Sequence, residues 1–288
     1  MRNGFTLIEM ITVIAILAII AAAVAIFLQY PLQSYQDAQR RAEITDAADT
    51  LFKRISRDLQ TALPNSVRVT NAGAVYYLEF LQTRTGGRYR AAHGGETAVC
   101  PTASGDGDVM AFGIADTCFR SIGDVPNLTS IAAGSDFLVI YNLGPGFTNA
   151  NAYAAGAATG GNKSLITAVA AATGSENQIT FQSNTFALAS PGNRFQVVSG
   201  PVSYVCTPGA GAAGTVQRYS GYAISAAQPT PPAGGTVALV AQNIVNCTFT
   251  YNTTNQRTGV VSMWLSFADP GGGSAVNLSE QVQVSNVP

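Results

Sequence analysis

The chain has 288 residues, of which 47% are hydrophobic and only 11% charged, and its formal net charge is −1. So low a charge content argues against a nucleic-acid-binding protein, because such a protein needs a basic face to meet the phosphate backbone. The best basic cluster is Arg84, Arg88 and Arg90 beside Tyr89, in a glycine-containing stretch that we interpret as a solvated loop. We therefore expect no nucleic-acid partner.

A long apolar run follows the first four residues and holds one charge, Glu9. At about 1.5 Å per helical residue, this run can cross a bilayer core of roughly 30 Å, and we predict a transmembrane helix over residues 5–30. A secretory signal peptide is the alternative, but its apolar stretch is shorter, about 7 to 15 residues. A carboxylate in hydrocarbon costs on the order of 2.5 to 3.5 kcal/mol, so Glu9 is a candidate functional residue that needs a basic partner.

The order of the first nine residues is distinctive. A polar leader with Arg2 ends at Gly4, the apolar run begins abruptly at Phe5, and the acid falls four residues later. This order resembles the class III signal of type IV pilins and type II secretion pseudopilins. The resemblance implies that residues 1–4 are a leader removed by prepilin peptidase between Gly4 and Phe5, and that Phe5 is then methylated.

The same resemblance implies a partner for the intramembrane acid. Glu9 would face the free amine of a neighbouring subunit's Phe5 in a growing fibre, so that two charges costly in lipid neutralise each other. The implied partners are other pilin and minor pilin subunits, prepilin peptidase and the inner membrane.

Residues 31–63 have the pattern of an amphipathic helix that continues into the ectodomain. Apolar or small residues recur at helical spacing, at Tyr35, Ala38, Ala42, Ala48, Phe52, Ile55, Leu59 and Ala62. The acids Glu43, Asp46 and Asp49 alternate with basic residues at spacings near three and four, which indicates surface ion pairs rather than catalytic carboxylates. We expect a kink at Pro31 and a helix end before Pro64.

From residue 64 to residue 288 the pattern predicts a β-rich globular domain. Short runs rich in Val, Ile, Tyr and Phe alternate with Gly, Pro, Asn and Ser clusters. Strands are predicted near residues 75–81, 136–144, 178–186, 194–206, 216–224, 243–251, 260–267 and 275–284. Residues 146–163 and 207–215 are predicted surface loops. The expected fold is α+β, with a long N-terminal helix packed on a mainly antiparallel, pilin-like β domain.

Two of these strands show which face is buried. Val261, Met263, Leu265 and Phe267 alternate along one predicted strand, and Val245, Cys247, Phe249 and Tyr251 along another. An alternation of apolar and polar residues, which gives a strand one apolar and one polar face, is typical of an antiparallel sheet with one face buried.

The four cysteines are Cys100, Cys118, Cys206 and Cys247, with no C-x-x-C pair. An even number in an exported domain predicts disulfides, and four cysteines allow three connectivities. We favour Cys100 with Cys118, which bracket one loop, and Cys206 with Cys247, which lie on two predicted strands; free thiols are the alternative.

Motifs of catalysis or metal binding are not found. There is no nucleophile elbow, Walker loop or H-E-x-x-H, and His93, the only histidine, lies in a glycine-flanked stretch. Asp106 and Asp108 in a G-D-G-D turn could ligate calcium, but an ordinary turn is the simpler interpretation. We therefore expect a protein that is not an enzyme and has no cofactor.

Further stretches extend the resemblance along most of the chain, namely LPNSVRV, GGRYR, DFLVIYNLG, RFQVVSGPVSYVC and QVQVSNVP. Together they resemble the minor pilin-like biogenesis proteins of mannose-sensitive haemagglutinin (MSHA) type IV pili, with broader kinship to J-type pseudopilins. The resemblance implies a single-pass inner-membrane subunit with a periplasmic ectodomain that helps prime or cap a fibre at the cell surface. The alternatives are a pilus-tip, adhesin-like subunit and a pseudopilin of type II secretion.

Overall fold

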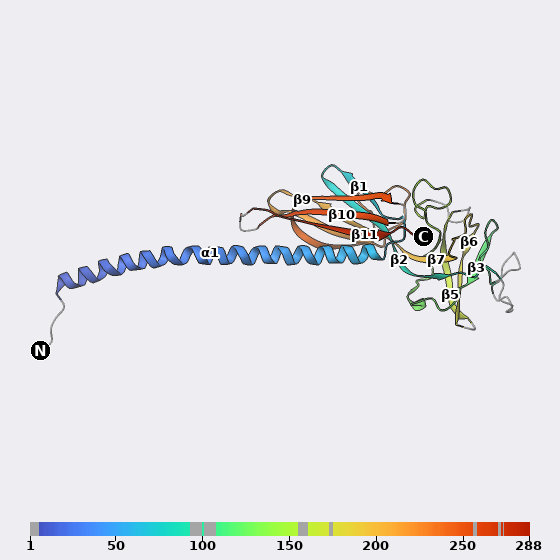
Figure 1. Ribbon diagram of the computed structural model, residues 1–288, viewed down its shortest axis with the longest axis horizontal. Helices are drawn as coiled ribbons and strands as arrows, with labels where there is room; N and C mark the ends of the chain where they lie inside the picture. The colour runs from blue at the N-terminus through green and yellow to red at the C-terminus, as the bar shows by residue number, and fades with distance from the viewer. Residues whose placement is uncertain are drawn as a thin grey trace.

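A computed structural model describes residues 6–92, 100, 108–154, 161–172, 175–255, 258–269, 272 and 274–288. One long helix, α1 (Leu7–Gln60), projects from a β domain (Figure 1). The strands are β1 (Arg68–Ala72), β2 (Val75–Arg88), β3 (Asp116–Arg120), β4 (Phe137–Ile140), β5 (Lys163–Ala172), β6 (Glu176–Asn184), β7 (Arg194–Thr207), β8 (Gly214–Ser220), β9 (Thr236–Asn255), β10 (Thr258–Phe267) and β11 (Val276–Ser285). The α+β arrangement predicted from the sequence is confirmed.

Helix α1 is continuous over 54 residues, so the predicted transmembrane and amphipathic segments belong to one element. It passes through Pro31 without interruption, and Figure 1 shows a gentle curve in place of the sharp kink expected there. The helix gives way at Thr61 to a turn before Pro64, as predicted.

Only the C-terminal part of α1 packs against the domain. Its buried face consists of Ile44, Ala48, Leu51, Phe52, Ile55 and Leu59. Tyr35 is 70% exposed, and Ala38 and Ala42 are exposed as well. The first half of the predicted packing stripe is therefore wrong, because at 3.6 residues per turn Ala38 and Ala42 point away from the side of the helix on which Ile44 and Ala48 are buried.

The strands form one antiparallel sheet in the order β11-β10-β9-β8-β7-β4-β5-β6-β3, and β2 pairs with both β1 and β7. Strands β2 and β7 are paired along nearly their whole length, from Tyr76 opposite Cys206 to Arg88 opposite Arg194. The first residues of β7 pair with β4 on the other edge, and its last residues pair with β8. The β2–β7 pair therefore runs through both parts of the domain.

Two lobes share this pair. The helix lobe buries the inner face of α1 against β8–β11, β1 and the first half of β2, and its core includes Phe80, Phe249 and Met263. The distal lobe, farther from the N-terminus in Figure 1, has a separate core built on Phe119, Phe181 and Phe195 of β3, β6 and β7. A small third cluster, including Leu63, Leu81 and Tyr153, lies at the joint between them.

The basic cluster predicted as a solvated loop is instead strand. Arg84 and Arg88 lie in β2, and Tyr89, which follows it, is fully buried. A Cβ added at Gly86 would lie 2.7 Å from the carbonyl oxygen of Phe195, so glycine here permits the close approach of β7. The glycines that suggested a loop instead allow β2 and β7 to pair closely.

Two other expectations from the sequence are corrected. Within the predicted loop 146–163, the described residues Ala152 and Tyr153 are buried, and the Tyr153 hydroxyl donates to the Ser66 carbonyl over 2.9 Å. Val245 is 39% exposed, because a bulge in β9 sets Ser266 opposite Asn246 and Phe267 opposite Ile244. Ile244 takes the buried position that alternation had assigned to Val245.

Candidate functional site: the N-terminal assembly segment

Thr6 and Glu9 form a reciprocal cap at the start of α1. The Glu9 backbone N–H donates to the Thr6 hydroxyl oxygen over 3.4 Å, and the Glu9 carboxylate accepts from both the N–H and the hydroxyl of Thr6 at 3.0 Å. This capping box satisfies donors that a helix start leaves unpaired and places the negative charge at the positive end of the helix dipole. Within a single subunit, the carboxylate already has hydrogen-bond partners.

The segment that follows the cap is a candidate membrane span. Residues Leu7–Phe27 have a mean hydropathy of 3.0, and none of this stretch is buried against the rest of the chain. A helix of this length and composition can cross a bilayer. Its exposed apolar side chains need lipid or other subunits around them.

The processing residues lie at the edge of what the structure describes. Gly4 and Phe5 are outside the described residues, and Thr6, the first described residue, has extended backbone geometry with φ of −80° and ψ of 152°. The helix therefore begins two residues after Phe5, the position predicted to become the mature N-terminus.

Comparison with known proteins identifies this segment. Residues 1–25 match the prokaryotic N-terminal methylation motif. The match includes Gly4, Phe5 and Glu9, and it marks the start of the chain as a type IV pilin-like signal, which implies processing by prepilin peptidase and assembly with other pilins. Together with the apolar helix, it fits a single-pass membrane anchor. The comparisons with curated proteins and with solved structures gave no match.

The cysteines are joined in the pairing favoured from the sequence. Cys100 bonds to Cys118 at a sequence separation of 18, and Cys206 bonds to Cys247 at a sequence separation of 41. Disulfides that close loops of this size contribute roughly 2–4 kcal/mol. Cys206 and Cys247 are fully buried and link β7 to β9 inside the helix lobe.

Asp58 anchors the end of α1 to the sheet, a role that its place on the charged helix face did not indicate. Its Oδ2 accepts from the Tyr204 hydroxyl over 2.8 Å and from Arg218 Nε over 2.7 Å. Burial and then the charge of Asp58 raise the pKa of Tyr204. A second tether joins Arg40 to the buried Asp269 over 3.4 Å.

The other charged candidates take structural positions. Asp49 pairs with Lys53 on the exposed helix face, as expected for a surface ion pair. Asp108 is buried with its Oδ1 3.6 Å from Arg120 Nε, so a cation already faces this carboxylate; Asp106 and His93 lie outside the described residues. Among the described residues, no group of three or more His, Cys, Asp or Glu side chains could hold a metal.

A groove of about 1400 Å³ lies where the two lobes meet, beside the C-terminal residues. Its walls include Tyr141, Phe147 and Tyr251, together with Arg68. Arg68 is already held by the buried Glu79, with 2.5 Å between Nη2 and Oε1. This groove marks the joint of the lobes, and of the two arginines that line it, Arg68 and Arg194, the first is already paired within the fold.

Proposed function

We propose that the chain is a minor pilin-like subunit of an MSHA-type type IV pilus, resembling the biogenesis protein MshO, and that its role is structural. The observation that carries the proposal is the methylation motif at residues 1–25, joined to a helix whose first half is not packed against its own domain. In this role, the subunit is held in the inner membrane with a periplasmic ectodomain and then helps prime or cap the fibre at the cell surface.

The assembly step follows from the capping geometry. The Glu9 carboxylate has four lone-pair sites and accepts two hydrogen bonds from Thr6, so an oxygen is free to accept from the amine of a neighbour's Phe5. That contact would turn an isolated intramembrane charge into a neutral pair, which favours the assembled state over the lone subunit.

Processing and assembly can be tested separately. The variant Gly4→Val should leave the leader uncut, because a branched side chain replaces the small residue before the scissile bond. Mass spectrometry of the protein from membranes reads this out, with Ala72→Val, at an exposed position of β1, as the matched control. Mature mass at the wild-type level in the Gly4 variant would falsify the processing claim.

A deletion strain then tests the role in the fibre. Loss of surface pili on deletion, restored by the wild-type chain, supports the assembly role. Normal pili together with lost secretion of type II substrates would indicate the pseudopilin alternative.

An adhesin-like role at the fibre tip is the second candidate. It is favoured by the position of the distal lobe, at the opposite end of the molecule from the N-terminus (Figure 1). Normal pilus numbers with lost surface attachment in the deletion strain would support it over the assembly role.

A further inference from the structure

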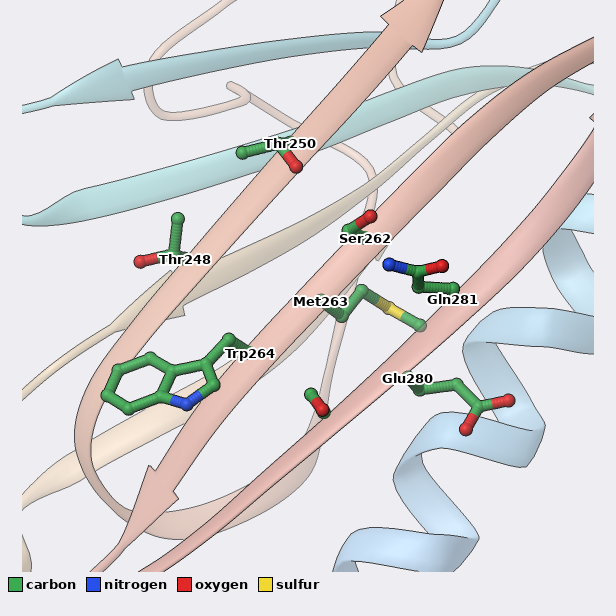
Figure 2. Close-up of a pocket in the computed structure, with 8 residues that line it drawn as sticks. Thr248, Thr250, Ser262, Met263, Trp264, Glu280 and Gln281 are labelled. Carbon is green, nitrogen blue, oxygen red and sulfur yellow. The ribbon is translucent and has the colours of Figure 1, made fainter.

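The outward face of β9, β10 and β11 carries a hollow that takes no part in the Thr6–Glu9 cap or the membrane span. The inner face of these strands lies in the core of the helix lobe. On the other face, a shallow hollow of about 300 Å³ is lined by Thr248, Thr250, Ser262, Trp264, Ser279 and Gln281, with Met263 and Glu280 at its floor and edge. Figure 2 shows Trp264 beside Thr248, and Ser262 near Gln281.

The hollow arises from strand register. Trp264 lies opposite Thr248 on one side and Ser279 on the other, and Ser262 lies opposite Thr250 and Gln281. Cross-strand partners share a face of the sheet, so one large indole is surrounded by small hydroxyl side chains that cannot fill the space beside it. Trp264, the only tryptophan of the chain, is 37% exposed.

This face is uncharged. Each outward residue of β10 has one partner on β9 and one on β11, and together the three form a row across the sheet. The rows on either side of the hollow consist of Asn246, Ser266 and Asn277, and of Asn252, Val260 and Gln283. These four rows of three outward positions contain no Asp, Glu, Lys or Arg. Glu280 belongs to the opposite face, because it pairs in register with the buried Met263, and Figure 2 shows it beside the helix.

We propose that this Trp264 hollow binds a neutral oligosaccharide. The indole has an electron-rich face that attracts the weakly positive C–H groups on one side of a sugar ring. The surrounding hydroxyl and amide groups both donate and accept hydrogen bonds, as sugar hydroxyls require. The six lining side chains of this face are uncharged, and the one charge at the edge of the hollow, Glu280, is negative and disfavours an anionic ligand, so a neutral glycan is the chemistry that fits. The inference rests on the proposed display of the domain on a fibre.

The same features disfavour a protein partner. The centre of a protein interface is enriched in aromatic residues, Met and Arg packed together. Here, Trp264 is the one aromatic side chain among the six lining residues on this face, and its neighbours are those of a wet, polar surface.

The single tryptophan gives a direct measurement on the full chain, purified in a detergent without a sugar headgroup. Maltohexaose, cellohexaose and chitohexaose are titrated while Trp264 emission is recorded. At least one should cause a saturable change, whereas an anionic oligogalacturonate should cause none. No change with any neutral oligosaccharide up to about 10 mM, a range that detects even weak binding, would overturn the proposal.

Variants are then compared by calorimetry. Trp264→Ala should weaken binding at least tenfold, and Gln281→Ala severalfold, while Leu239→Ala, an exposed residue on β9 outside the hollow, should bind as wild type does. Trp264→Phe, which keeps a ring, should retain partial affinity and guards against a folding defect in the alanine variant. Wild-type affinity in Trp264→Ala would refute the site.

Fibre assays separate this proposal from the assembly role. Trp264→Ala should support normal pilus numbers, so loss of glycan binding and loss of assembly are independent results. A photocrosslinker at position 264 that captures a pilin subunit in intact fibres would show a protein partner instead and would overturn the proposal.

Discussion

Glu9 has hydrogen-bond partners before any neighbouring subunit arrives. The sequence alone indicated a charge in need of a basic partner, and the structure adds that Thr6 provides two of its hydrogen bonds. In the proposed fibre, the same carboxylate would keep its contacts with Thr6 and accept from a neighbour's amine as well.

Two substitutions at Glu9 separate capping from charge pairing. Glu9→Gln keeps an amide oxygen that can accept from Thr6 but removes the charge, whereas Glu9→Leu removes both. We expect both variants to insert in the membrane and both to enter sheared pili about tenfold less than wild type, a factor that corresponds to about 1.4 kcal/mol. Quantitative immunoblotting measures incorporation; wild-type incorporation of Glu9→Gln would show that capping alone matters.

Tyr204 should make the fold sensitive to alkali. Burial, and then the charge of Asp58, raise its pKa, so the folded protein keeps the phenolic proton where the unfolded chain, with a pKa of about 10, releases it. This contribution to stability is complete below about pH 10 and is lost as the pH rises through that value toward the folded pKa.

The variant Tyr204→Phe should therefore lose about 0.5–1.5 kcal/mol of stability near neutral pH, for the hydrogen bond to Asp58, but fall less steeply above pH 10. Thermal unfolding of the full chain between pH 7 and about 11 measures both effects. Tyr219→Phe, whose hydroxyl bonds to Gln217 on the same strand, is the control. Equal slopes in wild type and Tyr204→Phe would contradict the argument.

The burial and the role of an individual residue were harder to predict from the sequence than the strand or helix to which it belongs. Alternation along β10 identified its buried large apolar residues correctly, since side chains of a regular strand alternate between its two faces. The same alternation failed at Val245 of β9. A bulge there depends on the pairing register of β9 with β10, which the sequence of β9 alone does not determine. The anchoring role of Asp58 was missed for a similar reason, because its partners Tyr204 and Arg218 are 146 and 160 residues away.

Among the elements, α1 divides into a half that packs on the sheet and a half that does not. Ile55 is fully buried in the helix lobe. The variant Ile55→Ala should lower the free energy of unfolding by about 2–5 kcal/mol, because apolar burial is lost and a cavity is left behind. Tyr35→Ala, on the exposed half, should stay within about 0.5 kcal/mol. Denaturant unfolding of the full chain in micelles measures both; a large loss in Tyr35→Ala would place that residue in a contact that the subunit does not show.

Element prediction succeeded where the composition was distinctive. Strands rich in Val, Ile and aromatic residues were found, and so was the helix. Strands β1, β3 and β5 were missed. Strands β1 and β3 are only five residues long, and the second half of β5 is mostly alanine, which has low strand propensity; pairing with β4 and β6 holds β5 in the sheet. The second half of β2 was taken for a loop because glycine usually marks turns.

For the whole molecule, the joint between the lobes depends on a buried amide. Asn142 Nδ2 donates to the Pro64 carbonyl over 2.7 Å, and its Oδ1 accepts from the Ala152 N–H over 2.9 Å. It thus connects the end of the helix segment to the distal lobe. This joint could not be predicted from the sequence, because the residues that form it are far apart in the chain and none of them belongs to a recognisable sequence motif.

Asn142→Ala should leave two backbone groups without their partners, at about 1–3 kcal/mol each. We expect a loss of about 2–4 kcal/mol in unfolding free energy on this basis, with faster hydrogen exchange in residues 142–153. The exposed Asn71→Ala on β1 is the control. Unchanged exchange in this segment would mean that the small apolar cluster alone holds the joint.

The orientation of the helix lobe strands also has a mechanical consequence. In Figure 1, β9, β10 and β11 run nearly along the axis of α1, and antiparallel hydrogen bonds lie perpendicular to their strands. In the proposed fibre, a pull on the membrane end of α1 would therefore load these bonds in shear, many at once. The same pull across the strands would open them one after another, so this geometry suits a subunit that must bear tension.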